Sequence, residues 1–143
     1  MGKKRVIKKT EGEVMKKKAT KSPVSKSKAI KKGRIYISAS YNNTMMTLTD
    51  AEGKVINWAT AGNLGFKGTK KATPYAASEV ANAISEKAER LGMKEVDIFV
   101  KGVGTGRSSA LRAFAAKDII INSIKDVTPI PHNGCRPPGP RRT

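Results

Sequence analysis

The sequence is poor in the residues that build most catalytic and metal centres. Its 143 residues include one histidine, one cysteine and 11 acidic residues. A single cysteine excludes an internal disulfide, and one imidazole with one thiol falls short of the about four ligands of a structural zinc site. No apolar run approaches the roughly 20 residues of a membrane-spanning helix. These shortages favour a soluble protein of a reducing compartment, without metal, cofactor or membrane partner.

Positive charge is what the sequence has in excess. It contains 29 lysines and arginines, which give a net charge of +18. Such a charge attracts polyanions at long range, so nucleic acid is the leading class of partner. The length suits one domain with a real core. A single nucleic-acid-binding domain is therefore expected.

The charge is concentrated at the start of the chain. Residues 1–34 hold 14 lysines and arginines against two glutamates, and they contain few apolar residues. Such a segment cannot offset the entropy of ordering by burying a core. We expect a basic N-terminal arm over residues 1–33 that is disordered when free and orders on a polyanion, although a merely solvated charge run stays open.

Alternating apolar and polar residues follow the arm. Their period of two predicts strands over residues 34–41, 44–50 and 54–59, joined as an antiparallel meander. The pair Asn42-Asn43 suits a tight hairpin turn, and Gly53 is expected with a positive φ in the next one. Trp58, in the third strand, is either a core anchor or a platform for base stacking, and core burial is favoured because indoles dominate cores.

A glycine-rich basic segment and a helix come next. Residues 62–74 predict a long, mobile, basic loop, a type that tends to be functional. Thr73 is expected to cap a helix that starts at Pro74 and ends at Gly92. Apolar residues at helical spacing, such as Val80 and Ile84, mark the buried stripe of this helix.

The second half of the sequence predicts a parallel strand that leads into another helix. Residues 96–100 are nearly all apolar, which is typical of a strand buried on both faces after a helical crossover. A glycine-rich turn follows, and then a helix with Leu111, Phe114 and Ala115 on its buried side. A last strand is expected within residues 118–127.

The turn between that strand and helix, "KGVGTGR", has the form of an anion site. Such turns aim backbone N–H groups at a phosphate. Arg107 stands where a dinucleotide-binding motif needs its last glycine, and no Gly-Lys-Ser/Thr follows as in a P-loop. A polymer backbone near Arg107, Ser108 and Arg112 is therefore favoured over a free nucleotide. A purely structural turn with a helix cap at Ser108 stays open.

The C-terminal segment "PHNGCRPPGPRRT" contains both His132 and Cys135. Its prolines hold the backbone extended, which disfavours the fixed geometry of a Cys-His catalytic pair. Its arginines suit phosphates, and His132 suits a base edge or base stacking. A loosely ordered tail without contacts remains the alternative. Because a glycine follows Asn133, its side-chain amide is open to attack by the next backbone nitrogen, which predicts isoaspartate formation there.

Four segments together resemble a known family. "SYNNTMMTLTD", "GFKGTKKATPYAA", "KGVGTGR" and "DVTPIPHNGCRPP" closely resemble, in order and separation, ribosomal protein eleven of the small subunit, over about residues 33–143. The resemblance implies an α/β fold with a mixed central β-sheet between helices, of ribonuclease-H-like topology but without nuclease carboxylates. The expected divisions are the arm 1–33, an rRNA-binding α/β domain 34–128 and a Pro/Arg-rich tail 129–143.

The resemblance also implies a function. It suggests a structural, non-enzymatic protein of the small-subunit platform in the cytoplasmic ribosome, which bridges helices of 16S-type rRNA and helps form the cleft for the mRNA leader duplex. Implied neighbours are small-subunit proteins seven and eighteen and initiation factor three. The implied rRNA-binding residues are Asn42, Asn43, Thr44, Phe66, Lys67, Gly68, Thr69, Lys70, Lys71, Gly104, Gly106, Arg107, Ser108, Arg112, His132, Asn133, Arg136, Arg141 and Arg142.

Differences from the family pattern lie mainly in one turn. The family usually has prolines at the positions of Val103 and Thr105, and commonly a glutamate at that of Ser108. Two other classes of function stay open. A metal-dependent nuclease would need converging carboxylates, yet the aspartates lie on separate predicted elements at Asp50, Asp97, Asp118 and Asp126. A general nucleic-acid chaperone or compacting protein fits the charge but does not explain the specific loops.

Overall fold

Three antiparallel strands form the first half of the sheet. The structure, a computed structural model, describes residues 30–140. Strand β1 (Lys32–Ala39) pairs with β2 (Thr44–Asp50), which pairs with β3 (Val55–Thr60), so the predicted meander is confirmed. The predicted turns are also found: residues 40–43 close the first hairpin, and Gly53 has a φ of 94°.

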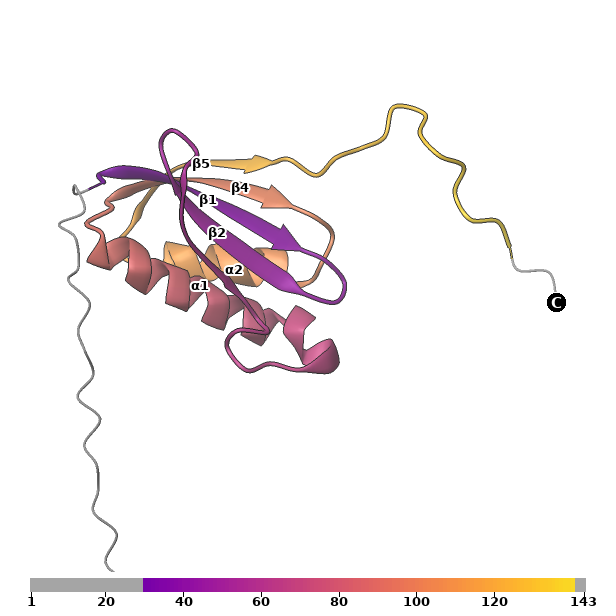
Figure 1. Ribbon diagram of the computed structural model, residues 1–143, viewed down its shortest axis with the longest axis horizontal. Coiled ribbons are helices and arrows are strands. Elements are labelled where there is room, and N and C mark those ends of the chain that lie inside the picture. Colours follow the sequence, from indigo (N-terminus) through magenta and orange to yellow (C-terminus); the bar gives the residue numbers. More distant parts are fainter. Residues whose placement is uncertain (1–29, 141–143) are drawn as a thin grey trace, which may run out of the picture.

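Two helical crossovers add the parallel half. Helix η1 (Gly68–Ala72) and helix α1 (Pro74–Arg90) lead to β4 (Glu95–Lys101), and α2 (Gly106–Ala115) leads to β5 (Ile120–Asp126). Strand β4 pairs in parallel with both β1 and β5. The strand order is β3-β2-β1-β4-β5 (Figure 1), which confirms the mixed sheet and the ribonuclease-H-like topology.

The first residues of α1 show why the helix begins where it does. The Thr73 hydroxyl accepts a hydrogen bond from the Ala76 N–H at 3.3 Å, and Pro74 occupies the first helical position, where its missing N–H costs nothing. At the other end, Gly92 adopts a φ of 76°. The predicted Thr73 cap, start at Pro74 and stop at Gly92 are all confirmed.

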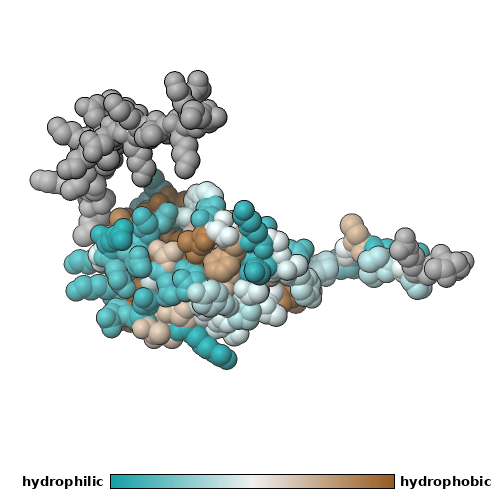
Figure 2. All heavy atoms as spheres, turned by 90° about the horizontal axis from the view of Figure 1, so that it is seen from below, coloured by the Kyte–Doolittle hydropathy of each residue, from teal (hydrophilic) through white to brown (hydrophobic). Residues whose placement is uncertain are grey.

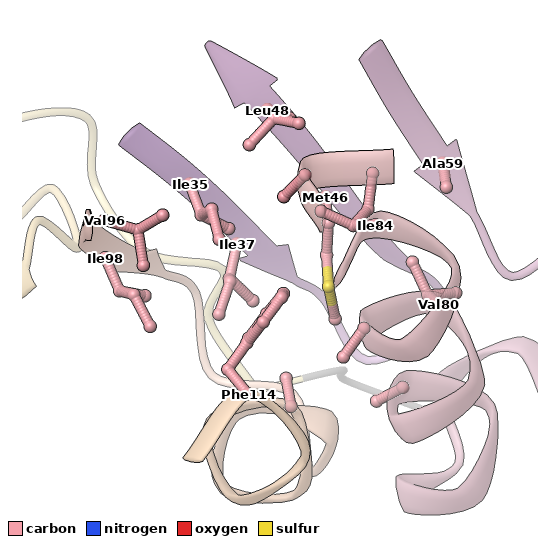
Figure 3. Close-up of a cluster of buried hydrophobic side chains, with 14 of the residues drawn as sticks. Ile35, Ile37, Met46, Leu48, Ala59, Val80, Ile84, Val96, Ile98 and Phe114 are labelled. Carbon is pink, nitrogen blue, oxygen red and sulfur yellow. The ribbon is translucent and has the colours of Figure 1, made fainter. Parts of the chain in front are cut away.

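The core fills the space between one face of the sheet and the two helices. Ile35 and Ile37 of β1 meet Phe114 of α2, while Met46 of β2 faces Val80 of α1 (Figure 3). All five of these side chains are at most 1% exposed. Burial of aliphatic and aromatic side chains on this one face therefore holds the sheet and helices together.

The opposite face of the sheet is uncovered by any described helix. Helices α1 and α2 lie on the same side of the sheet (Figure 1), and in β4 only Val96, Ile98 and Val100 are buried. The expectations that this strand is buried on both faces and that the sheet lies between helices are therefore wrong. The polar Asp97 interrupts the apolar run and turns with Phe99 toward the open face.

Two side chains differ from their predicted burial. Trp58 is 54% exposed, because the favoured core position in β3 belongs to its neighbour Ala59 while Trp58 faces the open side of the sheet. Ala115 of α2 is exposed as well, and Ala110 is buried instead. Ala110 and Phe114 are one helical turn apart, so they share the stripe that meets the core.

Candidate nucleic-acid interface

One edge of the sheet gathers most of the segments predicted to contact RNA. Strands β1, β3, β4 and β5 end at this edge, and β2 begins there (right side of Figure 1). The segments that follow the four ending strands therefore lie at the same edge. Backbone hydrogen bonds join them: Ala61 N–H donates to Thr44 at 3.1 Å, and Gly104 N–H donates to Ala39 at 2.9 Å. We call residues 40–43, 61–72, 102–107 and 127–140 together the basic edge.

The segment after β3 holds most of the cations of the basic edge. Lys67 and Lys70 are exposed, Lys71 is half-buried, and residues 61–73 contain no acidic side chain. The segment is better ordered than the expected mobile loop, since it contains η1 and packs the Phe66 ring edge-on against Tyr75 with centroids 6.0 Å apart. Residues 65–70 line a shallow hollow, which leaves the lysines facing solvent.

The turn between β1 and β2 offers fewer contacts than predicted. Asn42 is exposed, and Asn43 is half-buried with its N–H donating to the Ser40 hydroxyl at 3.1 Å. Thr44 is fully buried, beside the backbone of Gly106. The side chain of Thr44 therefore packs inside the protein, and the RNA contact predicted for this turn rests on Asn42 and Asn43.

The glycines between β4 and α2 serve close packing. A Cβ at Gly102 or Gly104 would collide with the backbone carbonyl of Ala39 or Ser40, respectively, and one at Gly106 would lie 2.8 Å from the Thr44 hydroxyl. Helix α2 starts at Gly106, so the alternative of a cap at Ser108 is wrong. The N–H of Gly104 is bonded within the protein, which leaves less of this turn for a phosphate than its sequence indicated.

Arg107 joins that turn to the start of the C-terminal tail. Its guanidinium donates to the Gly102 carbonyl at 2.6 Å and forms an ion pair with Asp126. The Asp126 carboxylate also accepts from the hydroxyl and N–H of Thr128, at 2.6 and 2.9 Å. The Thr128 hydrogen bonds, together with Arg107, lower the pKa of Asp126 to about 2. We call Arg107, Asp126 and Thr128 the tail clamp.

Sequence reasoning assigned Arg107 to RNA and missed Asp126 and Thr128. A signal was present, because an aspartate two residues before a threonine is the spacing at which an Asp side chain bonds the backbone ahead of it. Two further residues of α2 that were predicted to bind RNA differ from Arg107, because the side chains of Ser108 and Arg112 are exposed. Within α2, the structure thus leaves Ser108 and Arg112 facing solvent.

The C-terminal tail runs away from the domain without helix or strand as far as residue 140 (Figure 1). His132, Asn133, Cys135 and Arg136 are all exposed, and Asn133 has a φ of 55°. Arg141 and Arg142, which were predicted to bind RNA, lie outside the described residues, as does the basic segment 1–29. The tail therefore offers its side chains to a partner rather than to the domain.

Carboxylates do not gather into a metal site in the part of the chain that the structure describes. No three His, Cys, Asp or Glu side chains of residues 30–140 come close enough to hold an ion, so the four aspartates considered for a nuclease do not form one there. No described helix is long and apolar enough to cross a membrane. Viewed from the helix side, the surface is mostly hydrophilic with smaller hydrophobic patches (Figure 2).

These features define a small, strongly basic α/β protein whose loops and tail meet at one edge of an open-faced sheet. Residues 33–142 match the family model described as "Ribosomal protein S11". Relatives named small ribosomal subunit protein uS11 include those of Thermosipho melanesiensis (55% identical over 109 residues, 76% of this chain and 84% of the relative) and Treponema pallidum strain Nichols (50% over 115 residues, 80% and 91%). That of Colwellia psychrerythraea is 51% identical over 126 residues, 85% of this chain and 98% of the relative.

The chain belongs to the ribosomal protein S11 family. The resemblance seen in the four sequence segments is thereby confirmed. The family is one of ribosomal proteins, not of enzymes.

Proposed function

We propose that the protein is a structural constituent of the platform of the small ribosomal subunit. There it binds and bridges several helices of the 16S-type rRNA and helps form the cleft that holds the mRNA leader duplex. The observation that carries this proposal is the convergence of four separate chain segments at the basic edge. Membership of a family of small-subunit proteins supports it.

The two ends of the domain support a bridging role. The tail leaves from the basic edge after β5, whereas β1 begins at the opposite edge of the sheet (Figure 1). In the sequence, residues 1–29 precede β1. Those first residues carry a large share of the lysines. Cationic sequence is therefore linked to the domain at both edges of the sheet, which would let one protein neutralise phosphates on RNA helices that lie apart.

The side chains of the basic edge fall into two roles. Lys67, Lys70, Lys71 and Arg136 supply phosphate contacts, which set affinity and register, and Arg112 of α2 adds one from outside the basic edge. Side chains of the protein recognise the RNA sequence at unpaired bases, because they cannot enter the narrow major groove of A-form RNA. Asn42, Asn43, Phe66 and His132 are the candidates for this reading. Gly68 and Thr69 shape the loop between β3 and α1 that carries Phe66. Arg141 and Arg142 extend the phosphate contacts along the tail.

The platform location gives the partners. Small-subunit proteins seven and eighteen and initiation factor three are the neighbours that we expect in the cytoplasmic ribosome. None of these contacts needs a metal, a cofactor or a turnover step from this chain. The protein therefore acts as a scaffold.

Salt dependence tests the proposal. If about 6 to 10 phosphates are neutralised, the affinity of the free protein for small-subunit rRNA falls by roughly 10³ to 10⁵ between 50 and 200 mM salt. A flat response would overturn the proposal. Competition with duplex DNA separates it from the second candidate, a general nucleic-acid chaperone: equal affinity for duplex DNA and rRNA would favour the chaperone.

We also propose that Asn133 forms isoaspartate. Asn133 is exposed, lies in a segment without regular structure and is followed by Gly134. Because glycine has no side chain, the Gly134 backbone nitrogen can attack the Asn133 side-chain carbonyl carbon and expel ammonia. Water then opens the resulting cyclic imide to give isoaspartate. Peptide mapping of aged protein should show a fraction of isoaspartate at this position, and intact asparagine alone would contradict the proposal.

A further inference from the structure

A row of aromatic side chains crosses the uncovered face of the sheet. In the strand register, Trp58 of β3 stands beside Thr47, Thr47 beside Tyr36, Tyr36 beside Phe99 and Phe99 beside Lys125. The row therefore spans all five strands at one level. We call these five residues the aromatic row.

The aromatic row is open to solvent. Trp58 is 54% exposed and Tyr36 is 36% exposed, and no described helix lies over them (Figure 1). The Tyr36 and Phe99 rings stack on each other with centroids 5.0 Å apart and planes 15° apart, and Thr47 of β2 separates this pair from Trp58. Met45, 41% exposed, extends the same face toward the basic edge. Exposed clusters of large apolar side chains mark binding surfaces.

The charges on this face are arranged for a polyanion. Lys125 ends the aromatic row, and Lys101 lies between the row and the basic edge. Arg34 lies on the side of the row that is farther from the basic edge. The two carboxylates of the face lie beyond the row, away from the basic edge, and each is bonded. Glu95 pairs with Lys32 at 2.9 Å, and Asp97 accepts from Ser123 at 2.7 Å.

We propose that the aromatic row is a stacking platform for unpaired bases of the rRNA strand that the basic edge holds by its phosphates. The inference rests on the proposed function and adds to it a second contact surface with a different chemistry. Unpaired RNA carries both flat apolar bases and negative charge, and this face offers both complements. Open sheet faces with aromatic side chains recognise RNA in this way, and every base has a π-face to stack. The platform is also continuous with the basic edge through Met45 and Lys101.

Trp58 is the only tryptophan of the sequence, so its fluorescence reports on the row in the full-length protein. A single-stranded 12-nucleotide RNA of mixed sequence should quench the Trp58 emission as it binds, because stacked bases contact the indole. Inorganic polyphosphate is the matched probe: it carries phosphates without bases. Polyphosphate should compete for the lysines of the basic edge but leave the Trp58 emission nearly unchanged.

Two substitutions at one position separate stacking from apolar contact. Trp58→Leu should weaken binding of the RNA roughly 5- to 150-fold. Its salt slope should stay that of the unsubstituted protein, since no phosphate contact is lost. Trp58→Phe keeps an aromatic ring and should retain most of the affinity. Because Trp58 is half-exposed and outside the core, circular dichroism should show the same fold for all three proteins.

Different experimental results would contradict the stacking platform and the proposed function. If rRNA binds with the steep salt dependence expected, yet Trp58 emission does not change and Trp58→Leu binds equally well, the stacking platform is wrong and the scaffold role stands. If the emission responds only when another small-subunit protein is added, the face is a protein interface and the inference is overturned. If no variant binds rRNA, both proposals fall together.

Discussion

Two glycine-rich basic segments lie side by side at the basic edge, and the structure uses them differently. In residues 61–72, a Cβ added at Gly65 or Gly68 would meet no atom within 4 Å, and the nearby Lys67 and Lys70 face solvent. In residues 102–107, Gly102 and Gly104 press against the backbone of β1, and Arg107 is bonded within the protein. The space around a glycine, rather than the glycine itself, thus separates a loop that presents cations from a turn that packs.

The largest effect that this comparison predicts is on stability. Gly102 combines a φ of 99° with backbone contact to Ala39, so Gly102→Ala brings both left-handed strain and a collision. We expect it to lower the free energy of unfolding by about 3 kcal/mol or more. Gly65 has a φ of 91° but open space, so Gly65→Ala should cost only about 1–2 kcal/mol. Urea denaturation of both variants measures the difference. Equal losses would show that the two turns do not differ in packing.

The next effect concerns RNA binding. Replacing Lys67, Lys70 and Lys71 together by alanine should reduce the magnitude of the negative slope of log affinity against log salt by about 2 to 3, because each phosphate contact contributes about 0.7 to 0.9. Arg107→Ala should change this slope by less than one such contact, since its guanidinium is bonded to Gly102 and Asp126. Filter binding at several salt concentrations gives both slopes. A larger change for Arg107 than for the lysines would reverse the roles of the two segments.

A smaller effect is a pH dependence of the tail clamp. The pKa of Asp126 is lowered from 3.8 to about 2 in the folded protein, first by the hydrogen bond from the Thr128 hydroxyl, then by that from Arg107 and by that from the Thr128 N–H. A lowered folded-state pKa means that the clamp stabilises the protein above about pH 4 and that this contribution disappears as the pH falls toward 2. The backbone N–H of Thr128 should then lose its protection from hydrogen exchange over this range.

Asp126→Asn is the control for the clamp. This variant cannot titrate at position 126, so exchange of the Thr128 N–H should be faster at neutral pH and should show no transition between pH 4 and 2 beyond the intrinsic rate. If the unsubstituted protein shows the same flat profile, the carboxylate does not hold the start of the tail.

The smallest expected effect is at the cysteine. Cys135 is exposed and lies in the tail, and no described cluster of ligands surrounds it. Cys135→Ser should therefore change the free energy of unfolding by no more than about 0.5 kcal/mol. Added Zn²⁺ should shift the melting temperature of neither protein. A zinc-dependent rise that Cys135→Ser abolishes would show that the cysteine is a metal ligand after all.

The elements were predictable because their signals are local. The alternation in β1 and β2, the Thr73-Pro74 helix start and the stop at Gly92 each depend on neighbouring residues alone. The predictions that were wrong concern which face of the sheet the helices cover. An apolar strand such as β4 looks the same in sequence whether one face or two are buried, and for that reason Phe99 was placed in a core that exists on one side only. Trp58 was placed there because indoles are usually buried, yet it faces the uncovered side.

The candidate site was predictable in part, for a similar reason. The loop after β3, the turn before α2 and the tail could be named from their residues, and the turn at residues 40–43 from the family resemblance. The strand directions then bring all four segments to one place. The sequence did not predict which of these segments present side chains to solvent and which bond or pack them within the protein. The burial of Thr44 and the bonding of Arg107 to Asp126 join residues 19 or more positions apart, and no local pattern contains such contacts.

The central claim is that the basic edge, and not the outer face of α1, lies against rRNA. The exposed Cys135 is the only cysteine, so an iron-EDTA probe can be attached there for hydroxyl-radical cleavage in assembled small subunits. The matched protein carries Cys135→Ser and Glu86→Cys, which moves the probe to exposed α1. We predict strong rRNA cleavage, at defined nucleotides, from Cys135 and much weaker cleavage from position 86. Equal cleavage from both positions, or cleavage from position 86 alone, would contradict the account.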